Sequence, residues 1–361
     1  MSKGLTFAVV IAAGALALTA CGSKPTDSTS SSGSGTAATY KACMVTDTGG
    51  IDDRSFNASA WKGMQDAATA TGASVKYLES KASSDYTPNI NALISEKCNL
   101  IVTVGFLMGD ATKAAAKANP STDFAIVDEA PVDGLTNYKA LEFNTAQSSF
   151  QAGYLAASVS TTGTVGTFGG LPIPTVTIFM DGFVDGVAYY NTQKGKSVKV
   201  LGWDEATQKG SFVGGQNPFT DQAKGKSLAD GFIQQGADVI FPVAGGSGLG
   251  AVGEAQATKK AVAIWVDQDG YLTAPQFKDT FLSTVVKGVD ASVTATVKEG
   301  VEGKFNNTPY VGTLENGGTL LAPFHDLEAK VSADTKSELE AIRKGIIDGS
   351  ITIASPSQPK S

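Results

Sequence analysis

The chain carries the stretch YKACMVT at residues 40–46, followed by DTGGIDD at residues 47–53 and by SFNASAWKGMQDAATAT at residues 55–71. The first stretch is a short apolar run without alternation, which predicts a strand buried on both faces. Asp47 and the two glycines after it predict a tight turn. The third stretch has helical spacing, with Trp61, Met64 and Ala68 on one face. A buried strand, a Gly-rich turn and a helix form the first half of a βαβ unit.

The same alternation continues along most of the chain. Further strands are expected at residues 74–78, 100–105, 124–128, 164–168, 198–202, 239–243 and 261–266. Helices are expected at residues 86–97, 110–118, 148–160, 223–235, 250–259 and 333–348. A further helix is expected to run through residue 183 and to end at residue 191. This alternation predicts an α/β fold with doubly wound parallel sheets, and the strands are too many for one sheet, so we expect two lobes.

Composition excludes several classes of function. The chain has 361 residues with a net charge of −7, so a strong grip on a nucleic-acid backbone is not expected. It has a single histidine, His325, which excludes a His-rich metal site. Three cysteines are too few for a disulfide scaffold.

The N-terminal segment predicts export. Lys3 precedes an uncharged run that ends in Leu18-Thr19-Ala20-Cys21, an arrangement typical of a lipoprotein signal peptide. We therefore expect residues 1–20 to be removed and Cys21 to be lipidated, with residues 21–39, rich in Ser, Thr and Gly, as a tether. The expected location is the extracytoplasmic face of the cell membrane. An uncleaved transmembrane anchor is the alternative.

Polar and aromatic residues follow several of the predicted strands. In parallel sheets, ligands bind at the carboxyl ends of the strands, so these residues are candidates for a binding site. They are Asp47, Phe106, Asp110, Asp128, Gly245 and Asp267. In an exported protein with two lobes, such a site suits a transport receptor that encloses its ligand by hinge closure.

The motif VTDTGGIDDRSFN at residues 45–57 resembles the opening signature of the basic membrane protein family of bacterial lipoproteins. The best-understood members of that family are purine nucleoside receptors of ABC importers. Further matching stretches follow in order, and together they cover about residues 40–350. They are QAGYLAA at 151–157, VGTFGG at 165–170, DQAKGK at 221–226, AGGSGLG at 244–250 and STVVK at 283–287.

The resemblance implies a type I periplasmic-binding-protein fold, with two Rossmann-like lobes joined by three crossovers. We expect residues 40–143 and 268–309 in the first lobe, and residues 144–267 and 310–361 in the second. It also implies a nucleoside between the lobes and the permease and ATPase subunits of an importer as partners. We expect a monomer without cofactor, metal, nucleic-acid partner or enzymatic activity.

The family pattern suggests two rings that stack on the base. Phe56 opens a helix beside the Gly-rich turn, where its ring offers a face to a purine. Phe219 is expected to supply the second ring, with Phe212 as an alternative because the spacing in this region departs from the commoner one. Without the motif, a core phenylalanine would be the simpler interpretation of Phe56.

Carboxylates are the candidates for polar contacts. Asp267 is the strongest candidate for the ribose hydroxyls, with Asp269 as the fallback, and Arg54 is a candidate bridge between the lobes. For the aspartates, a helix N-cap is the alternative role. The other expected ligand contacts are Asp47, Asn57, Asp128, Gly245 and Lys287, the last of which matches a lysine of the family near the ligand.

Residues 248–253 read GLGAVG, a formal dinucleotide-binding motif with Asp267 downstream. An NAD-dependent enzyme is therefore a remote alternative. The motif lies late in the chain, and the export signal separates the protein from cytoplasmic cofactors. A second alternative is a receptor for a sugar or a signalling metabolite, because aromatic rings and carboxylates also suit those ligands.

A disulfide between Cys43 and Cys98 is expected. Cys43 lies in the first strand and Cys98 just before the third, and these strands are parallel neighbours in a 2-1-3 order. The expected compartment is oxidising enough for the bond to persist. The alternative is two separate buried thiols.

Overall fold

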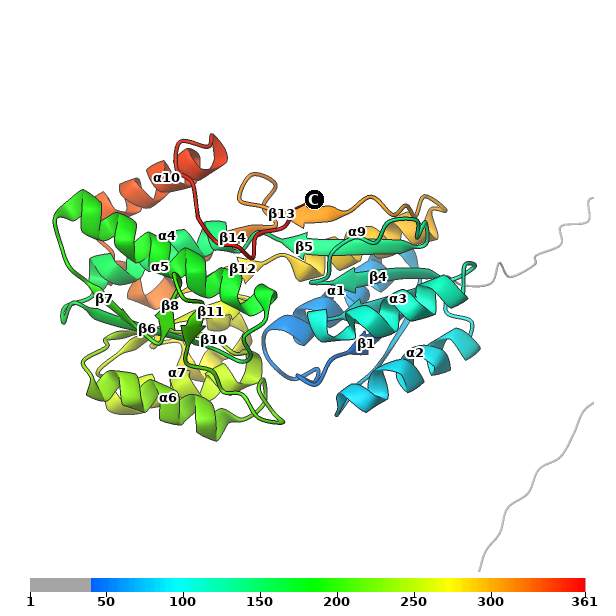
Figure 1. Ribbon diagram of the computed structural model, residues 1–361, viewed down its shortest axis with the longest axis horizontal. Coiled ribbons are helices and arrows are strands. Elements are labelled where there is room, and N and C mark those ends of the chain that lie inside the picture. The colour runs from blue at the N-terminus through cyan, green and yellow to red at the C-terminus, as the bar shows by residue number, and fades with distance from the viewer. Residues whose placement is uncertain (1–39, 361) are drawn as a thin grey trace, which may run out of the picture. The chain divides into compact units, whose positions relative to one another are not determined.

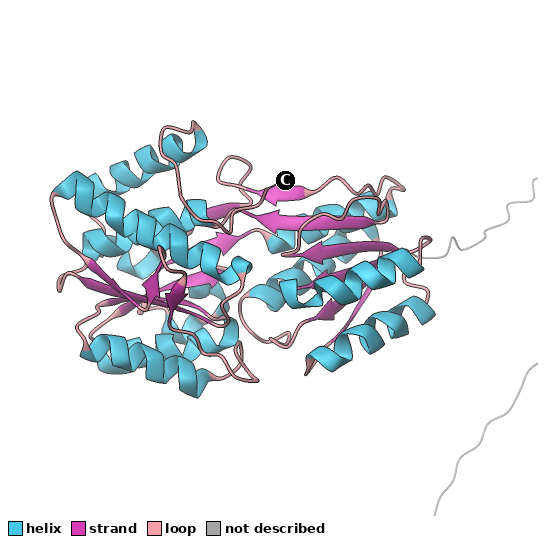
Figure 2. Ribbon diagram, in the orientation of Figure 1, coloured by secondary structure: helices cyan, strands magenta, loops and turns pink. Residues whose placement is uncertain are grey.

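Two six-stranded sheets with helices on both faces make up residues 40–360, the part of the chain that the computed structural model describes (Figure 1 and Figure 2). The predicted signal peptide, Cys21 and the tether lie outside the described residues. No helix among residues 40–360 is long and apolar enough to cross a membrane.

The first lobe contains β1 (Lys41–Thr46), α1 (Phe56–Thr71), β2 (Ser74–Leu78), α2 (Tyr86–Ser95), β3 (Leu100–Val104), α3 (Gly109–Ala118), β4 (Asp123–Val127), β5 (Tyr138–Phe143), α9 (Val289–Val301) and β13 (Tyr310–Gly312). The second lobe contains α4 (Ala146–Val159), β6 (Thr164–Gly169), α5 (Pro174–Lys194), β7 (Lys199–Leu201), the hairpin β8 (Trp203–Asp204) and β9 (Lys209–Gly210), α6 (Gln222–Gln234), β10 (Val239–Val243), α7 (Gly248–Thr258), β11 (Val262–Asp267), α8 (Gly270–Thr273), β12 (Phe281–Lys287), β14 (Thr319–Leu321) and α10 (Ala333–Ile347).

The strand orders are β13-β5-β4-β3-β1-β2 in the first sheet and β14-β12-β11-β10-β6-β7 in the second. Within these two sheets, every pairing is parallel except the one between β12 and β14. The predicted doubly wound α/β fold and the predicted 2-1-3 order of the first strands are therefore confirmed. The carboxyl ends of both sheets carry the loops that form the site described below.

Strand β1 shows why these sheets are apolar on both faces. Ala42 and Met44 pack in one core with residues of α1 and α9, whereas Cys43 and Val45 pack in another with residues of α2 and α3. All four side chains are fully buried. A strand covered on both sides needs no alternation, which is the pattern that YKACMVT shows.

Three crossovers join the lobes, between β5 and α4, between β12 and α9, and between β13 and β14. The expected lobe boundaries at residues 268 and 310 differ from this arrangement. Strand β12 pairs with β11 in the second sheet, with Ile264 opposite Ser283, so the chain crosses at Gly288 and not before residue 268. Strand β13 pairs with β5 in the first sheet, so the last crossover follows Gly312.

Strand β5 and helix α9 were not expected from the pattern. Strand β5 reads YKALEF, and its Lys139 is buried although lysine is normally exposed. The ammonium group of Lys139 lies 2.5 Å from a carboxylate oxygen of Glu299 in α9. The partner lies 160 positions further along the chain, so the sequence around the strand does not reveal it.

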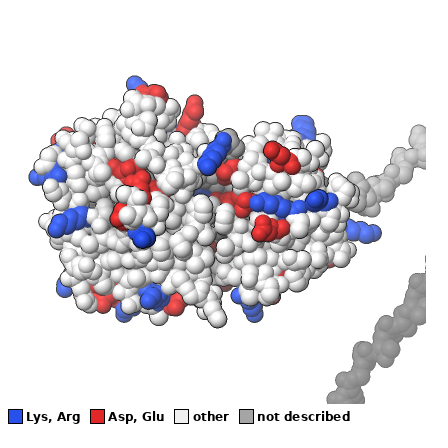
Figure 3. All heavy atoms as spheres, in the orientation of Figure 1, with Lys and Arg blue, Asp and Glu red and all other residues white. Residues whose placement is uncertain are grey.

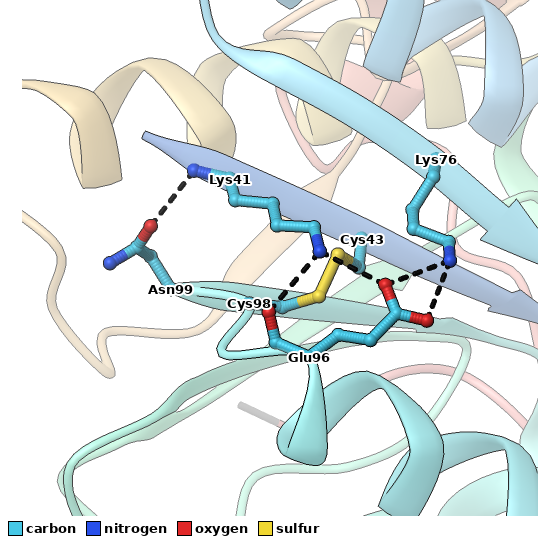
Figure 4. Close-up of a disulfide and its surroundings, with 6 residues drawn as sticks. All are labelled: Lys41, Cys43, Lys76, Glu96, Cys98 and Asn99. Atoms are coloured by element: carbon cyan, nitrogen blue, oxygen red, sulfur yellow. Dashed lines mark hydrogen bonds and ion pairs between the residues drawn. A yellow bond between two sulfur atoms is a disulfide. The ribbon is translucent and has the colours of Figure 1, made fainter. Parts of the chain in front are cut away.

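Cys43 and Cys98 are joined by a disulfide, with their Cα atoms 6.0 Å apart (Figure 4). The bond connects β1 to the loop between α2 and β3. Glu96 at the end of α2 also pairs with Lys41 of β1 and Lys76 of β2, at 3.0 and 2.7 Å. The disulfide and these ion pairs together hold the end of α2 against strands β1 and β2.

Candidate functional site

A cavity lies between the lobes at the carboxyl ends of both sheets, with about 580 Å³ of space when its open mouth is included. The first lobe contributes Asp47, Gly49, Asp53, Phe56, Asn57, Gly105, Phe106, Leu107 and Asp128 to its wall. The second lobe contributes Ile173, Thr175, Val176, Phe179, Phe219, Val243, Gly245, Val266, Asp267 and Lys287.

All eight residues expected to contact a ligand line this cavity. They are Asp47, Phe56, Asn57, Asp128, Phe219, Gly245, Asp267 and Lys287. Each lies at a strand end, in the loop after it, or at a helix start. Phe106 also lines the cavity, whereas Asp110 does not and is exposed in the first turn of α3.

Each lobe contributes a half-buried ring to the cavity, Phe56 from α1 and Phe219 from the loop before α6. Gly170 makes room for the second ring, because a Cβ atom there would lie 2.2 Å from Phe219 Cε1. The alternative residue, Phe212, does not line the cavity. Its ring packs edge-on against Trp203, with centroids 5.8 Å apart. The structure thus places Phe219 in the site and Phe212 behind it.

Asp47 and Asn57 form a buried polar pair in the first lobe. Asp47 Oδ1 accepts hydrogen bonds from the backbone N–H of Gly49 and from Asn57 Nδ2, both at 2.9 Å. These bonds fix the orientation of the Asn57 amide. Asn57 Oδ1 is buried and has no hydrogen-bond partner among the described residues. A buried acceptor without a partner is costly, so a ligand N–H or O–H directed at it would be stabilising.

Asp53 is a lining residue that was not singled out from the sequence. Its carboxylate accepts the backbone N–H groups of Ser55, Asn57 and Ala58, at 3.0, 2.8 and 3.0 Å. It therefore caps the start of α1 and sets the position of Phe56 and Asn57. Its place inside the motif of residues 45–57 was the available signal, but nothing in the motif separates a capping role from ligand contact.

Lys287 ends β12 and forms an ion pair with Asp128, which follows β4 in the other lobe. Both side chains are buried, at 3% and 8% exposure. The ammonium group also lies 4.7 Å from the centroid of the Phe56 ring, within the range of a cation–π contact. Lys287 is the only cationic side chain among the described residues that line the cavity.

Asp267 lies at the end of β11, where its Oδ2 accepts a hydrogen bond from the hydroxyl of Ser55. Its Oδ1 has no partner among residues 40–360, and the residue lines the cavity. Asp128 and Asp267 both have positive φ, at 71° and 66°. Residues other than glycine adopt this conformation at some cost, and such positions cluster at functional sites. The fallback residue, Asp269, instead caps α8 and pairs with His325 at 2.7 Å.

Burial raises the pKa of all four carboxyl groups that line the cavity, because the charged form loses water there. The pKa of Asp53 rises to about 7. Lys287 opposes the effect by lowering the pKa of Asp128 and Asp267. With four carboxyl groups and one lysine that is already paired, the cavity favours a ligand that donates hydrogen bonds and disfavours an anion.

The glycines of the GLGAVG motif pack helices and do not line the cavity. A Cβ atom on Gly250 would lie 1.9 Å from the carbonyl oxygen of Gln222 at the start of α6. A Cβ atom on Gly248 would lie 2.9 Å from the ring of Trp265. These contacts support a packing role for the glycines, and among the described residues their backbone does not approach the cavity.

Arg54 does bridge the lobes, but through its backbone. Its carbonyl oxygen accepts hydrogen bonds from Thr273 Oγ1 and Trp265 Nε1, at 3.1 and 3.4 Å, whereas its side chain is exposed.

On the face of the described residues that Figure 3 displays, positive and negative side chains are interspersed. Residues 40–360 hold no cluster of His, Cys, Asp and Glu that could bind a metal ion.

Comparison with known proteins shows the family to which this chain belongs. Residues 40–355 match the model of the Bmp family, described as "ABC transporter substrate-binding protein PnrA-like". The chain belongs to the Bmp family. The basic membrane protein resemblance is thereby confirmed, and the chain is a substrate-binding protein of an ABC transporter that acts outside the cytoplasm.

Several curated proteins of the Bmp family resemble this member along most of its length. The ABC transporter nucleoside-binding protein BmpA of Lactococcus lactis subsp. cremoris is 34% identical over 333 residues, which cover 87% of this chain and 89% of the relative. Basic membrane protein A of Borreliella burgdorferi is 28% identical and covers 87% and 88%. These relatives are named as binding or membrane proteins, not as enzymes.

Solved structures show the fold of this Bmp protein independently. A solute-binding protein of an ABC transporter system from Aeropyrum pernix K1 superimposes with a TM-score of 0.78 at 26% identity, covering 88% of this chain and 93% of the other. The arabinose-binding protein AraP of Geobacillus stearothermophilus has a TM-score of 0.56 at 16% identity, covering 81% and 100%. At that identity the likeness shows the fold alone. The predicted type I periplasmic-binding-protein fold is confirmed.

Proposed function

We propose that this protein captures a nucleoside, with purine nucleosides as the expected class, between its two lobes and delivers it to an ABC importer. The observation that carries the proposal is the makeup of the cavity. An aromatic ring from each lobe, Phe56 and Phe219, lines the same space as carboxylate oxygens that lack partners among the described residues. A nucleoside needs both, because its base is a flat apolar surface and its ribose carries hydroxyl donors. The nucleoside-binding relative from Lactococcus lactis supports the choice.

In this proposal each part of the ligand has its own contacts. The base stacks between Phe56 and Phe219, and its edge donates to Asn57 Oδ1, with Asp47 and Asp128 close by. The ribose hydroxyls donate to Asp267 Oδ1. Lys287, which is paired with Asp128, also contacts the ligand. Gly245 lines the cavity beside Phe219, and its φ of 50° lies in the left-handed region that favours glycine.

The charge of the cavity predicts a preference for nucleosides over nucleotides. A phosphate group would meet four carboxyl groups, and the one lysine present is already paired with Asp128. We therefore expect a nucleoside monophosphate to bind at least about ten-fold more weakly than its nucleoside, since one uncompensated repulsion of about 1.4 kcal/mol suffices for that ratio.

Single substitutions test the placement of the site. Phe56→Ala is expected to weaken guanosine binding by about 1–3 kcal/mol through lost stacking. Asp267→Ala is expected to cost a similar amount, because it leaves a ribose hydroxyl without a partner in a closed cleft. Phe212→Ala is the matched aromatic control and should leave the affinity unchanged within about two-fold. If calorimetry shows equal affinity for all three variants and the original protein, the site is elsewhere.

We further propose that Cys21 becomes the lipidated N-terminus. The support is the sequence Leu18-Thr19-Ala20-Cys21 and the Ser/Thr/Gly-rich stretch after it. Two or more acyl chains would keep the receptor beside its importer. Fractionation of cells that express Cys21→Ser is expected to release the protein from the membrane fraction. Retention in the membrane with an unchanged mature mass would contradict the proposal.

A further inference from the structure

Besides the ion pair of Lys287 with Asp128, the two lobes touch directly at one edge of the cavity. The loop between β1 and α1, which carries Arg54 and Ser55, meets the segment from the end of β11 through α8. Besides the bonds to the Arg54 carbonyl, the amide of Gln268 donates to the Ser55 carbonyl oxygen at 3.3 Å. All of these contacts join protein to protein, so they do not require a ligand.

The first-lobe half of this contact is built rigidly. Asp53 accepts the backbone N–H of Ser55, and Ser55 is fully buried. Arg54 has a φ of 57°, a conformation that residues other than glycine adopt at a cost. The carbonyl oxygen of this same residue accepts hydrogen bonds from Thr273 and Trp265 of the other lobe. Its exposed side chain offers no compensating contact among the described residues.

The hydroxyl of Ser55 also fixes the Asp267 carboxylate. It donates to Oδ2, whereas Oδ1 has no partner among the described residues, and Asp267 lines the cavity. Among the described residues, Asp267 has no other hydrogen-bond donor, so without Ser55 no hydrogen bond fixes the orientation of its side chain. A hydrogen bond between a hydroxyl and a carboxylate in a buried place is among the stronger kinds.

We propose that Ser55 is a positioning residue for Asp267, and that Ser55 and the Arg54 carbonyl form with Thr273 a latch that holds the lobes closed. The latch forms only after the lobes meet, so it acts on the release of the ligand and not on its capture. The role of the latch in release rests on the proposed function, whereas its role in closure does not. Ser55 is thus an affinity-setting residue that need not touch the ligand.

Four variants separate the parts of the latch. Ser55→Ala removes the bond to Asp267. Thr273→Val removes the bond to the Arg54 carbonyl oxygen, at 3.1 Å, and a longer one to the Asp269 carbonyl oxygen, at 3.3 Å. Thr273→Ser keeps the hydroxyl and should behave like the original protein. Ser59→Ala is the control, because Ser59 is also buried and its hydroxyl accepts the backbone N–H of Asp290 within the same lobe, at 3.2 Å. Thermal melts of all variants establish that each is folded.

Small-angle X-ray scattering of protein stripped of ligand tests closure without any assumption about the ligand. We expect a larger radius of gyration for Ser55→Ala combined with Thr273→Val than for Ser59→Ala or the original protein. Equal radii for all of them would overturn the latch. This measurement remains decisive if no nucleoside binds, so failure of the proposed function is distinguishable.

Stopped-flow binding of guanosine tests the kinetic role. We expect the dissociation rate constant to rise about five-fold in Thr273→Val and about ten-fold or more in Ser55→Ala, with association rate constants unchanged within about two-fold. The affinity ratio between guanosine and dideoxyguanosine, which lacks the ribose diol, should fall in Ser55→Ala but not in Thr273→Val. An unchanged ratio in Ser55→Ala would overturn the positioning role.

Discussion

The substitution Gly170→Ala tests the position of the Phe219 ring, against which Gly170 packs. Gly170 follows β6 and its φ lies outside the left-handed region, so alanine fits its backbone. The added Cβ would lie 2.2 Å from Cε1 and 2.5 Å from Cδ1 of Phe219. Carbon atoms need about 3.5 Å, so the ring must move by roughly 1 Å or more toward the cavity. The half-buried Phe219 lies on a loop, which lets it move without disrupting the core.

The displaced ring loses its stacking position. Stacking of a base on an aromatic side chain is worth about 1–3 kcal/mol, so the dissociation constant for guanosine should rise by about five-fold to 150-fold. Isothermal titration calorimetry measures this directly. The control is Gly231→Ala in α6, where a Cβ atom would meet nothing within 4 Å. That variant should bind normally and be more stable by about 0.5–1 kcal/mol.

A double-mutant cycle decides whether the effect passes through the ring. In a Phe219→Ala background, Gly170→Ala should cause no further loss of affinity, because the methyl group then has no ring to displace. If Gly170→Ala alone binds guanosine as well as the original protein while Phe219→Ala binds weakly, then Gly170 does not set the position of the Phe219 ring.

Replacing Cys43 and Cys98 together by serine should lower the free energy of unfolding in urea by about 3–4 kcal/mol, because the bond closes a loop of 55 positions; an unchanged midpoint would contradict it. Gly250→Ala should also lower stability, by about 1–3 kcal/mol, without weakening guanosine binding, and a selective loss of binding would restore a ligand role for the GLGAVG motif. Burial raises the pKa of Asp53 to about 7, above its value in the unfolded chain, so between about pH 4 and 7 the folded protein holds a proton that the unfolded chain has released. The contribution of Asp53 to the free energy of unfolding should therefore increase as the pH falls from 7.5 to 5.5, and Asp53→Asn should flatten that slope in urea titrations at both pH values.

The strands and the candidate site were predictable for a shared physical reason. Parallel strands buried on both faces appear as plain apolar runs, and their carboxyl ends meet at one edge of a sheet. Asp47, Asp128 and Asp267 could therefore be placed near one another from their positions after the strands. The motif around Phe56 added the family pattern that strand positions alone do not supply.

Other features depend on contacts that no local pattern carries. Lys139 makes the buried strand β5 hard to predict from the sequence, because its partner Glu299 belongs to a helix far along the chain. The crossover at Gly288 depends on which sheet β12 joins, and an apolar run fits either sheet. Whether Asp53 caps α1 or contacts a ligand depends on the direction of its carboxylate. The same holds for Ser55, whose role depends on the other lobe.

Calorimetric titration of the ligand-stripped protein shows directly whether the cavity binds a nucleoside. The panel holds purine nucleosides, pyrimidine nucleosides, the free bases, free pentoses and a nucleoside monophosphate. We expect a nucleoside to bind tightly, and its free base, free pentose and monophosphate each to bind far more weakly, because each lacks half of the contacts or adds a repelled charge. Tight binding of a free sugar with no binding of any nucleoside would contradict it.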